Sequence, residues 1–276
     1  MRKIKEPLAK HTTFNIGGEA EILIPESTEE LIETIENFKL IDKNFRLLGN
    51  GSNVLVSDRG IRELVIKTTN FDKSILIEGN RVTTGASVLL LNLVKRIIKH
   101  NLGGIEYLCS VPGTVGGAIY MNAGRGRAYN KAISDFLISV EVFDGEKVFN
   151  ILKENLKFDY RYSSFHEYSN WVILSAKFDF LKQKKEIGEE KIRERLNIVK
   201  ERERTKPNIG SIFRNAPRFP MKGVRLCDAK FVSNNRICNM GNARFWQVFF
   251  LIKIAQLIHI VIPFFKKLDL EIQIWK

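Results

Sequence analysis

Two glycine-rich segments have the residue types and spacing that most clearly predict ligand chemistry in this chain. Residues 48–55 read LGNGSNVL, and residues 110–118 read SVPGTVGGA and are followed by MNAG at 121–124. Small residues let backbone N–H groups approach a ligand closely, and a diphosphate is the usual ligand of that geometry. Neither segment has the spacing of a Rossmann or P-loop motif. Two separate loops of this type predict one extended dinucleotide held between two lobes.

The composition is typical of a globular enzyme with an excess of positive charge. The 276 residues carry a formal net charge of +13, with 44% hydrophobic and 27% charged residues. A basic balance favours anionic partners such as nucleotides and phosphosugars. The Lys and Arg residues are spread along the chain and are not interleaved with aromatic residues. We therefore interpret them as a compositional bias and expect no nucleic-acid partner.

The spacing of cysteine and histidine argues against disulfides and metal sites. Cys109, Cys227 and Cys238 show no C-x-x-C pattern, and the four histidines show no ligand spacing. We therefore expect no metal and a reducing compartment, the cytoplasm. The N-terminus lacks the apolar core of a signal peptide. Residues 248–265 are apolar but broken by Lys253 and Pro263, which predicts a buried amphipathic helix and no membrane insertion.

Hydrophobic periodicity predicts an α+β chain in three parts, residues 1–66, 67–182 and 183–276. The first two parts read as α/β and α+β lobes, and the third follows a charged helix at 184–204. Strands are expected at 21–25, 45–48, 64–66, 74–77, 81–84, 137–143, 147–151 and 171–178.

Local signals predict where two of the helices begin and end. A capping box at residues 27–30 opens the helix of the first lobe. Ser87 is expected to cap the helix of the second lobe, and the glycines within residues 101–104 are expected to end it.

The motifs that carry chemistry lie in a fixed order along the chain. They read HTTFNIGG at 11–18, GNGSNVL at 49–55, GIE at 104–106, VPGTVGGA at 111–118, FDYRYS at 158–163, GSIFRN at 210–215 and LDLEI at 268–272. With this set the chain resembles the UDP-N-acetylenolpyruvoylglucosamine reductase family, the flavoenzymes of peptidoglycan precursor synthesis. The resemblance covers nearly the whole chain. Because the third lobe has no extra insertion, the chain resembles the shorter, type II subclass.

This resemblance implies both a fold and a reaction. The fold is of the vanillyl-alcohol-oxidase type, in which residues 1–66 and 67–182 hold FAD and residues 183–276 form an α/β lobe over the UDP-sugar. The implied reaction is the NADPH-dependent reduction of the enolpyruvyl group of UDP-N-acetylglucosamine enolpyruvate to UDP-N-acetylmuramate. The expected partner is this small-molecule substrate, and the expected oligomeric state is a monomer.

Three residues match the catalytic positions of the family. Hydride addition to an enol ether beside a carboxylate builds negative charge, and the product carbon then needs a proton. By resemblance, Ser211 donates that proton, Glu271 is the carboxylate paired with this step, and Arg161 stabilises the enolate. Each residue alone has a simpler interpretation, as a turn serine, a strand residue and a surface ion pair. The ordered motifs favour the catalytic interpretation.

The glycine loops match the FAD-binding positions of the family. The residues that the resemblance assigns to FAD are Asn50, Gly51, Ser52, Asn53, Pro112, Gly113, Thr114, Gly116, Gly117 and Asn122. Tyr160 and Lys206 are the candidates for substrate contact. Lys206 could neutralise the UDP phosphates, although a solvated lysine is its simpler interpretation.

The chain departs from the family pattern in three places. Residues 125–131 are longer and more basic, residues 229–236 lack the expected histidine, and the helix after Gly241-Asn242-Ala243 is unusually apolar. Two alternatives to the reductase therefore stay open. One is an FAD oxidoreductase of the same fold with another substrate, and the other is a non-enzymatic protein, either a degenerate flavin-binding homologue or a basic nucleic-acid binder.

Overall fold

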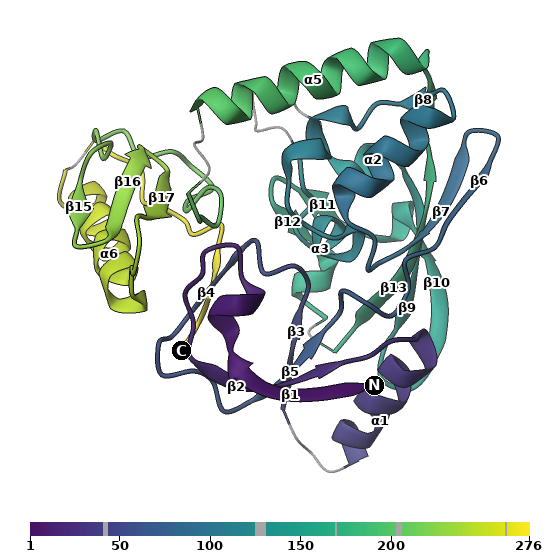
Figure 1. The fold of residues 1–276 in the computed structure, drawn as a ribbon, viewed down its shortest axis with the longest axis horizontal. Coiled ribbons are helices and arrows are strands. Elements are labelled where there is room, and N and C mark those ends of the chain that lie inside the picture. The colour runs from purple at the N-terminus through teal and green to yellow at the C-terminus, as the bar shows by residue number, and fades with distance from the viewer. Residues whose placement is uncertain (41–43, 125–130, 169, 203–205, 263) are drawn as a thin grey trace. The chain divides into compact units, whose positions relative to one another are not determined.

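The computed structural model describes the chain except residues 41–43, 125–130, 169, 203–205 and 263 (Figure 1). It folds into two compact units. The first unit comprises Met1–Lys3, Leu23–Asn50 and Val65–Arg202, and the second comprises Ile4–Ile22, Gly51–Leu64 and Glu203–Lys276. These units are defined by compactness alone, so the functional division at 1–66, 67–182 and 183–276 stays a prediction.

A four-stranded sheet contains the first three strands that the sequence predicts. Its order is β1 (Arg2–Pro7), β2 (Glu19–Ile24), β5 (Leu64–Lys67) and β3 (Phe45–Leu48), which confirms those three strands. Helix α1 (Thr28–Leu40) begins at the predicted box. The Glu30 N–H donates to Ser27 Oγ at 3.2 Å, so this serine stabilises the first turn.

The first unit is built on a five-stranded antiparallel sheet. The strand order is β10 (Val148–Leu152), β9 (Leu137–Phe143), β13 (Val172–Asp179), β7 (Arg81–Gly85) and β6 (Ile75–Glu78), which confirms the remaining five predicted strands. In β13 the buried residues alternate, from Val172 to Phe178, because successive side chains point to opposite faces.

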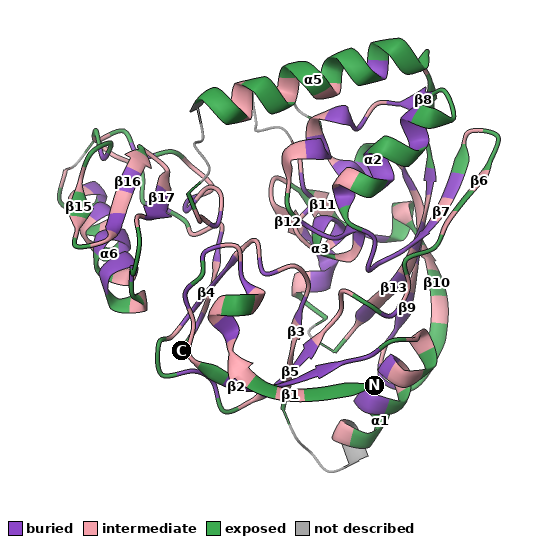
Figure 2. Cartoon of the chain, in the orientation of Figure 1, coloured by how far each residue is buried: buried purple, intermediate pink, exposed green. Residues whose placement is uncertain are grey.

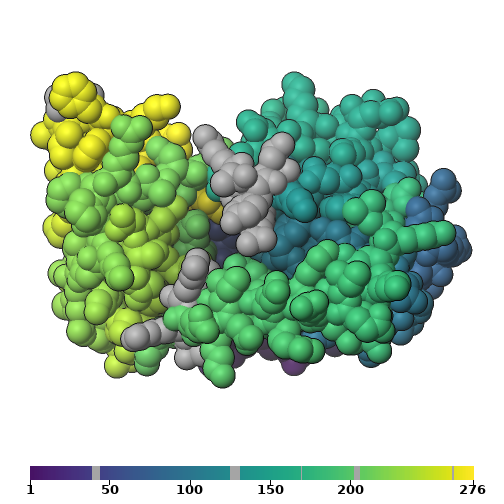
Figure 3. Space-filling model, turned by 90° about the horizontal axis from the view of Figure 1, so that it is seen from above, coloured from purple at the N-terminus to yellow at the C-terminus, as the bar shows by residue number. Residues whose placement is uncertain are grey.

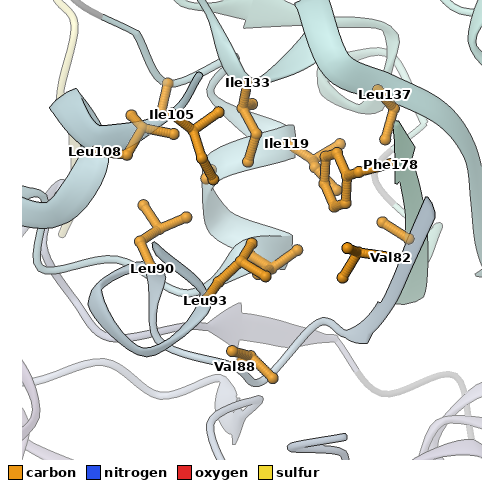
Figure 4. Packing of buried hydrophobic residues seen from close by; sticks show 14 of the residues in the cluster. Val82, Val88, Leu90, Leu93, Ile105, Leu108, Ile119, Ile133, Leu137 and Phe178 are labelled. Atoms are coloured by element: carbon orange, nitrogen blue, oxygen red, sulfur yellow. The ribbon is translucent and has the colours of Figure 1, made fainter. Parts of the chain in front are cut away.

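Two helices pack on the buried face of this sheet. They are α2 (Leu90–Lys99) and α3 (Val115–Tyr120). Figure 4 shows Leu93 of α2 and Ile119 of α3 in the same apolar cluster as Val82 and Phe178 of the sheet. This core holds the strand ends and loops that carry the candidate site.

The predicted caps of α2 are wrong. The helix begins after Leu89, and the Ser87 hydroxyl instead donates to the Thr68 carbonyl at 3.1 Å and accepts from the Asp72 N–H at 3.3 Å. At the other end Asn101 adopts the left-handed conformation, with φ of +57°. Asparagine tolerates this region better than most residues, so it replaces the expected glycine.

The charged segment forms α5 (Lys185–Arg202), and it packs within the first unit (Figure 3). Beneath it lies the 3₁₀ helix η2 (Glu106–Ser110). Arg195 Nε donates to Ser110 Oγ at 2.9 Å, and Lys191 Nζ lies 3.9 Å from a carboxylate oxygen of Glu106. The two strands β8 (Leu102–Gly103) and β14 (Leu181–Lys182) pair just before η2 and α5.

The second unit has a separate core. It contains the parallel pair β4 (Val54–Val56) and β18 (Gln273–Trp275), and the antiparallel strands β15 (Arg225–Leu226), β16 (Ala229–Ser233) and β17 (Arg236–Asn239). Helix α6 (Phe245–Val261) begins three residues earlier than expected. Among the described residues, none of the helices is long and apolar enough to cross a membrane.

Short elements complete the two units. They are η1 (Leu8–His11), η3 (Ile133–Phe136), η4 (Lys153–Asn155), β11 (Phe158–Asp159), β12 (Tyr162–Ser163) and η5 (Ser164–His166).

The core of the first unit predicts a clear contrast between two leucines. Leu93 is fully buried in α2, whereas Leu76 in β6 is 62% exposed. We expect Leu93→Ala to lower the free energy of unfolding by about 2–5 kcal/mol, because it leaves a cavity. The matched Leu76→Ala change should cost less than about 0.5 kcal/mol. Urea denaturation followed by circular dichroism measures both, and equal losses would contradict the assigned core.

Candidate active site

The second glycine loop is held in place by backbone hydrogen bonds. The Val115 N–H donates to the Val88 carbonyl at 2.8 Å, and the Leu90 N–H donates to the Gly113 carbonyl at 3.0 Å. Thr114 caps α3, because its Oγ1 accepts from the Gly117 N–H at 3.2 Å. The loop is therefore a rigid turn between η2 and α3, both of which belong to the first unit.

The two glycine loops meet within the first unit. Asn50 Nδ2 donates to the Pro112 carbonyl at 2.7 Å. A Cβ on Gly49 would lie 3.2 Å from Thr114 Oγ1, which is tighter than an ordinary contact. The sequence predicts both loops but not this contact, which joins residues 62 positions apart.

Several loop N–H groups remain available for a ligand. Within the described part of the chain, no hydrogen bond uses the backbone N–H of Asn50, Gly113 or Thr114 in the first unit, or of Gly51 or Ser52 in the second unit. Backbone donors are normally satisfied, so the unused N–H groups of Asn50, Gly113 and Thr114 in the first unit fit an anionic ligand. These are positions that the sequence assigns to a diphosphate.

Two glycines of the second loop have a different role. The Gly116 N–H donates to the Ala86 carbonyl at 3.0 Å, and the Gly117 N–H donates to Thr114 Oγ1. Both donors are used inside the protein in this conformation. A Cβ on Gly116 would lie 3.0 Å from the Ala86 Cβ, so the lack of a side chain there permits close packing of α3.

Asn122 lies just beyond the end of α3 and has one unsatisfied polar atom. Its side chain is 7% exposed and its φ is +42°. Nδ2 donates to the Asp159 carbonyl at 2.9 Å, whereas the buried Oδ1 accepts no hydrogen bond from the described residues. A buried acceptor without a donor is costly, so Oδ1 is suited to a ligand N–H.

Tyr160 and Arg161 form the turn between β11 and β12. Arg161, the second central residue of this turn, has a φ of +58°, whereas Tyr160 has no positive φ; this is the pattern of a type II turn. Its guanidinium donates to the Gly124 carbonyl at 2.9 Å and lies 5.1 Å from the centre of the Tyr160 ring. The bond from Asn122 to Asp159 fixes this turn beside α3. The first unit thus brings Arg161, Tyr160 and Asn122 together.

Tyr107 is a polar residue of this region that the sequence did not single out. Its hydroxyl oxygen is buried and makes no hydrogen bond to a described residue. Burial raises the pKa of the phenol, the charges of Asp135 and Glu106 raise it further, and the Arg161 guanidinium lowers it. The tyrosine follows Glu106 in the GIE motif, so its position in the motif is the signal that could have identified it.

Ser211 and Glu271 lie on two hydrogen-bonded segments of the second unit. The Glu271 N–H donates to the Ile212 carbonyl at 2.9 Å, and the Arg214 N–H donates to the Asp269 carbonyl at 2.8 Å. The Ser211 segment is also fixed by Asn235, whose Oδ1 accepts from the Phe213 N–H at 2.8 Å. Two predicted catalytic residues, far apart in sequence, are therefore neighbours through this short ladder.

The first glycine loop also contacts this ladder. Asn53 Nδ2 donates to the Glu271 carbonyl at 3.0 Å, and the Gln273 N–H donates to the Asn53 carbonyl at 2.9 Å. Gly51 has a φ of +64°, and a Cβ there would lie 2.3 Å from the His11 carbonyl oxygen. The second unit therefore joins the end of the first loop to Glu271.

Lys206 is exposed, and its segment is anchored by Asn208. Thr13 Oγ1 donates to the Asn208 carbonyl at 2.7 Å, which explains the HTT motif as a structural anchor. The Lys206 carbonyl accepts from Asn208 Nδ2, and its side chain is neither buried nor ion-paired among the described residues. Solvation remains the simpler interpretation of this lysine.

The structure describes only some of the segments in which the chain departs from the family pattern. Residues 229–236 form β16 and its turn into β17, whereas 125–130 lie outside the described residues. Asn239 organises the GNA motif that follows, because its Oδ1 accepts from the N–H groups of Gly241 and Ala243 at 3.0 and 2.9 Å. Asn239 is a buried residue that the sequence did not predict as important.

Comparisons with known proteins agree with the predicted cofactor fold. A family model described as an FAD binding domain matches residues 20–147. The UDP-N-acetylenolpyruvoylglucosamine reductase of Carboxydothermus hydrogenoformans is 38% identical, over 98% of this chain and 92% of that protein. The reductase of the same name from Caldanaerobacter subterraneus is 34% identical, over 92% and 87%.

A solved structure agrees over the full length. The crystal structure of UDP-N-acetylenolpyruvylglucosamine reductase from Thermus caldophilus matches with a TM-score of 0.80 and 31% sequence identity, and the match covers 100% of both chains. These likenesses confirm the α+β FAD-binding fold that the sequence predicts.

The environment of Tyr107 predicts a dependence of stability on alkaline pH. Because the pKa of Tyr107 is raised in the folded protein, the unfolded chain loses this proton first, from about pH 10. Its contribution to stability is therefore complete below that pH and is lost as the pH rises.

We expect wild type to lose about 1 kcal/mol more than Tyr107→Phe between about pH 9 and pH 11. Denaturant melts at each pH measure the difference. The partly exposed Tyr168, as Tyr168→Phe, is the control and should follow wild type. Parallel profiles for all three proteins would show that the Tyr107 phenol is not buried.

Proposed function

Because the chain belongs to the UDP-N-acetylenolpyruvoylglucosamine reductase family, we propose that it reduces the enolpyruvyl group of UDP-N-acetylglucosamine enolpyruvate to give UDP-N-acetylmuramate, with NADPH as the hydride donor. It is an FAD-dependent oxidoreductase of peptidoglycan precursor synthesis. The observation that best supports the proposal is the pairing of two segments in the second unit. The Glu271 N–H donates to the carbonyl of Ile212, the residue after Ser211.

The residues of both glycine loops fit FAD. The free N–H groups of Asn50, Gly113 and Thr114 suit the diphosphate, and the buried Oδ1 of Asn122 suits a ring N–H. When bound, FAD supplies the hydride chemistry that no side chain of this protein can perform. In this proposal Gly116 and Gly117 contribute by shaping the loop, because their N–H groups are engaged within the protein.

Ser211 is the proposed proton donor. Within the described part of the chain its hydroxyl has no hydrogen-bond partner, so it is available to a ligand. Its Oγ gives the proton to the substrate carbon next to the carboxylate. A serine hydroxyl is a weak acid, so this transfer requires nearby groups that stabilise the charge left behind. We assign the paired carboxylate of this step to Glu271, whose backbone is fixed beside the serine segment.

Arg161 is the proposed electrostatic partner of the reacting group. Negative charge builds on the substrate carboxylate as the double bond is reduced, and a preorganised cation lowers the barrier. The guanidinium is already oriented by the Gly124 carbonyl, which reduces the cost of positioning it. Tyr160 in the same turn and Lys206 are proposed substrate contacts.

The oligomeric state and the compartment belong to the same proposal. We infer a cytoplasmic enzyme, because Cys109, Cys227 and Cys238 are all free thiols, as a reducing compartment favours. We infer a monomer, since the net charge of +13 opposes association of identical surfaces.

Removing the Ser211 hydroxyl tests the proposed reaction directly. We expect Ser211→Ala to retain bound FAD and its reduction by NADPH, but to lose turnover of the enolpyruvyl substrate by about 10²–10⁴-fold, because the proton donor is gone. Anaerobic half-reactions, each followed in the flavin spectrum, measure the two steps separately.

A matched serine controls for the substitution itself. Ser233→Ala lies at the exposed end of β16 in the same unit and should leave both half-reactions unchanged. Wild-type turnover in Ser211→Ala would remove Ser211 from the proposed role. Wild-type protein that is reduced by NADPH but is not reoxidised by the substrate would instead favour an oxidoreductase with another substrate.

A second substitution tests the geometry of the cation. Arg161→Lys keeps the charge but loses the planar fork that matches a carboxylate. We expect substrate turnover to fall roughly 10–10³-fold, with FAD content and reduction by NADPH preserved. Single-turnover kinetics measure the effect, and unchanged turnover would contradict a role for the guanidinium. Arg59→Lys, at an exposed position, is the control.

A further inference from the structure

Helix α6 has an exposed apolar stripe that the proposed reaction does not use. The opposite side of the helix is buried in the core of the second unit, with Val248, Leu251, Ile252 and Ala255 all at most 2% exposed. Figure 2 shows both buried and exposed residues along the helix, and since its exposed residues include Trp246, Phe250 and Leu257, the helix is apolar on both sides. A helix that is apolar all round normally has a second apolar partner.

The exposed apolar residues lie on one side of the helix, where the exposed Lys253 separates Phe250 from Leu257. At about 100° per residue, those within the helix fall inside an arc of roughly 100°, and Phe264 follows just beyond its end. Their exposed fractions run from 52% to 86%, for Trp246, Phe250, Leu257, Ile260, Val261 and Phe264. Exposed apolar side chains scattered singly are ordinary, but several on one side of a helix mark an interaction surface.

The charge in the sequence around the stripe is mostly positive. From residue 229 to residue 268 the sequence has six Lys and Arg residues and no Asp or Glu. Arg244, Lys253, Lys266 and Lys267 are exposed in or beside the helix. Asp58 accepts from the Phe245 N–H at 2.9 Å, so this carboxylate is engaged at the first turn. Asp228 accepts from the Asn242 N–H at 3.2 Å, and Asp269 follows Leu268 directly, so the stripe lies among an excess of positive over negative charges.

We propose that this face of α6 is a docking surface for an anionic lipid bilayer. The helix would lie in the plane of the membrane, with Trp246 and Phe250 among the headgroups and the flanking lysines on lipid phosphates. Exposed Trp, Phe and Leu with nearby Lys and Arg are the composition of such interfacial helices. The buried side stays packed in the second unit, so the helix lies on the bilayer and does not span it.

The same features argue against a second copy of the chain on this face. Pairing two copies through one stripe would bring equal sets of positive charge together, which is unfavourable. An anionic bilayer instead neutralises the lysines while the apolar side chains leave water. This inference goes beyond the proposed reaction and does not depend on it.

Vesicle binding by the full-length protein tests the proposal. We expect sedimentation with vesicles of equal parts phosphatidylglycerol and phosphatidylcholine, little sedimentation with phosphatidylcholine alone, and release by salt. Binding should shift the tryptophan emission to shorter wavelength, because Trp246 is 52% exposed whereas Trp275 is buried. Trp246→Phe should still bind but lose most of this shift.

Matched variants distinguish vesicle binding through the stripe from nonspecific adsorption of the protein to vesicles. Phe250→Ser with Leu257→Ser should weaken vesicle binding at least about tenfold. Leu76→Ser with Leu181→Ser removes two equally exposed leucines elsewhere, at 62% and 61%, and should bind as wild type does. Lys266→Gln with Lys267→Gln should weaken binding roughly tenfold or more at low salt, whereas Lys182→Gln with Lys184→Gln should not.

Circular dichroism shows whether each variant folds, so a loss of binding can be assigned to the surface. Wild-type protein that stays in solution with anionic vesicles at low salt would overturn the proposal. So would a Phe250→Ser, Leu257→Ser variant that binds as tightly as wild type. A concentration-dependent dimer in analytical ultracentrifugation that this variant abolishes, without vesicle binding, would assign the stripe to self-association instead.

Discussion

The rest of the site depends on how the second glycine loop satisfies its own backbone. A loop can present free N–H groups to a ligand in a fixed geometry only if its other donors and acceptors form hydrogen bonds with neighbouring groups. The Val88 and Ala86 carbonyls do so for Val115 and Gly116, and the Leu90 N–H does so for Gly113. The turn between β7 and α2 therefore fixes the conformation of the loop through these hydrogen bonds. The same arrangement explains why α3 can be only six residues long and still be fixed.

Each unit contributes a different part of the proposed chemistry. The first unit fixes Arg161 through the Gly124 carbonyl and fixes Asn122 through Asp159. The second unit fixes Glu271 through Ile212 and Asn53. In both units a backbone carbonyl or N–H group orients the functional segment, so its position depends on main-chain bonds more than on the identity of nearby side chains.

The strands and helices were largely predictable from the sequence because alternation and helical periodicity report burial directly. The caps of α2 were not predictable, because Ser87 hydrogen-bonds to Thr68 and Asp72, which are brought near only by the tertiary fold. The same reason applies to Gly116. Its motif indicates a phosphate loop, but its N–H group is used by Ala86, a partner thirty positions earlier in the chain.

The site residues show the same limit. The ordered motifs predict Ser211 and Glu271 as catalytic residues, but only the structure shows that the two segments share a hydrogen-bonded ladder. Tyr107 and Asn239 were missed because a single buried polar side chain leaves no periodic signal in a sequence. Their importance comes from what surrounds them, namely the charge near Tyr107 and the two N–H groups that bind Asn239.

The parallel pairing of β4 with β18 limits the order in which parts of the chain can fold during synthesis. Val54 pairs with Gln273 and Val56 with Trp275, so β4 pairs with residues that are translated 219 positions after it (273 minus 54). At ribosomal speeds of about 5–20 residues per second, β4 waits roughly ten to forty seconds for that partner. The chain of the first unit ends at Arg202 and is therefore complete before β18 is translated, whereas β4 still lacks its parallel partner at that point. The Ser211–Glu271 ladder can form only after Glu271 has been translated, so the proposed catalytic segment of the second unit is assembled after the chain of the first unit is complete.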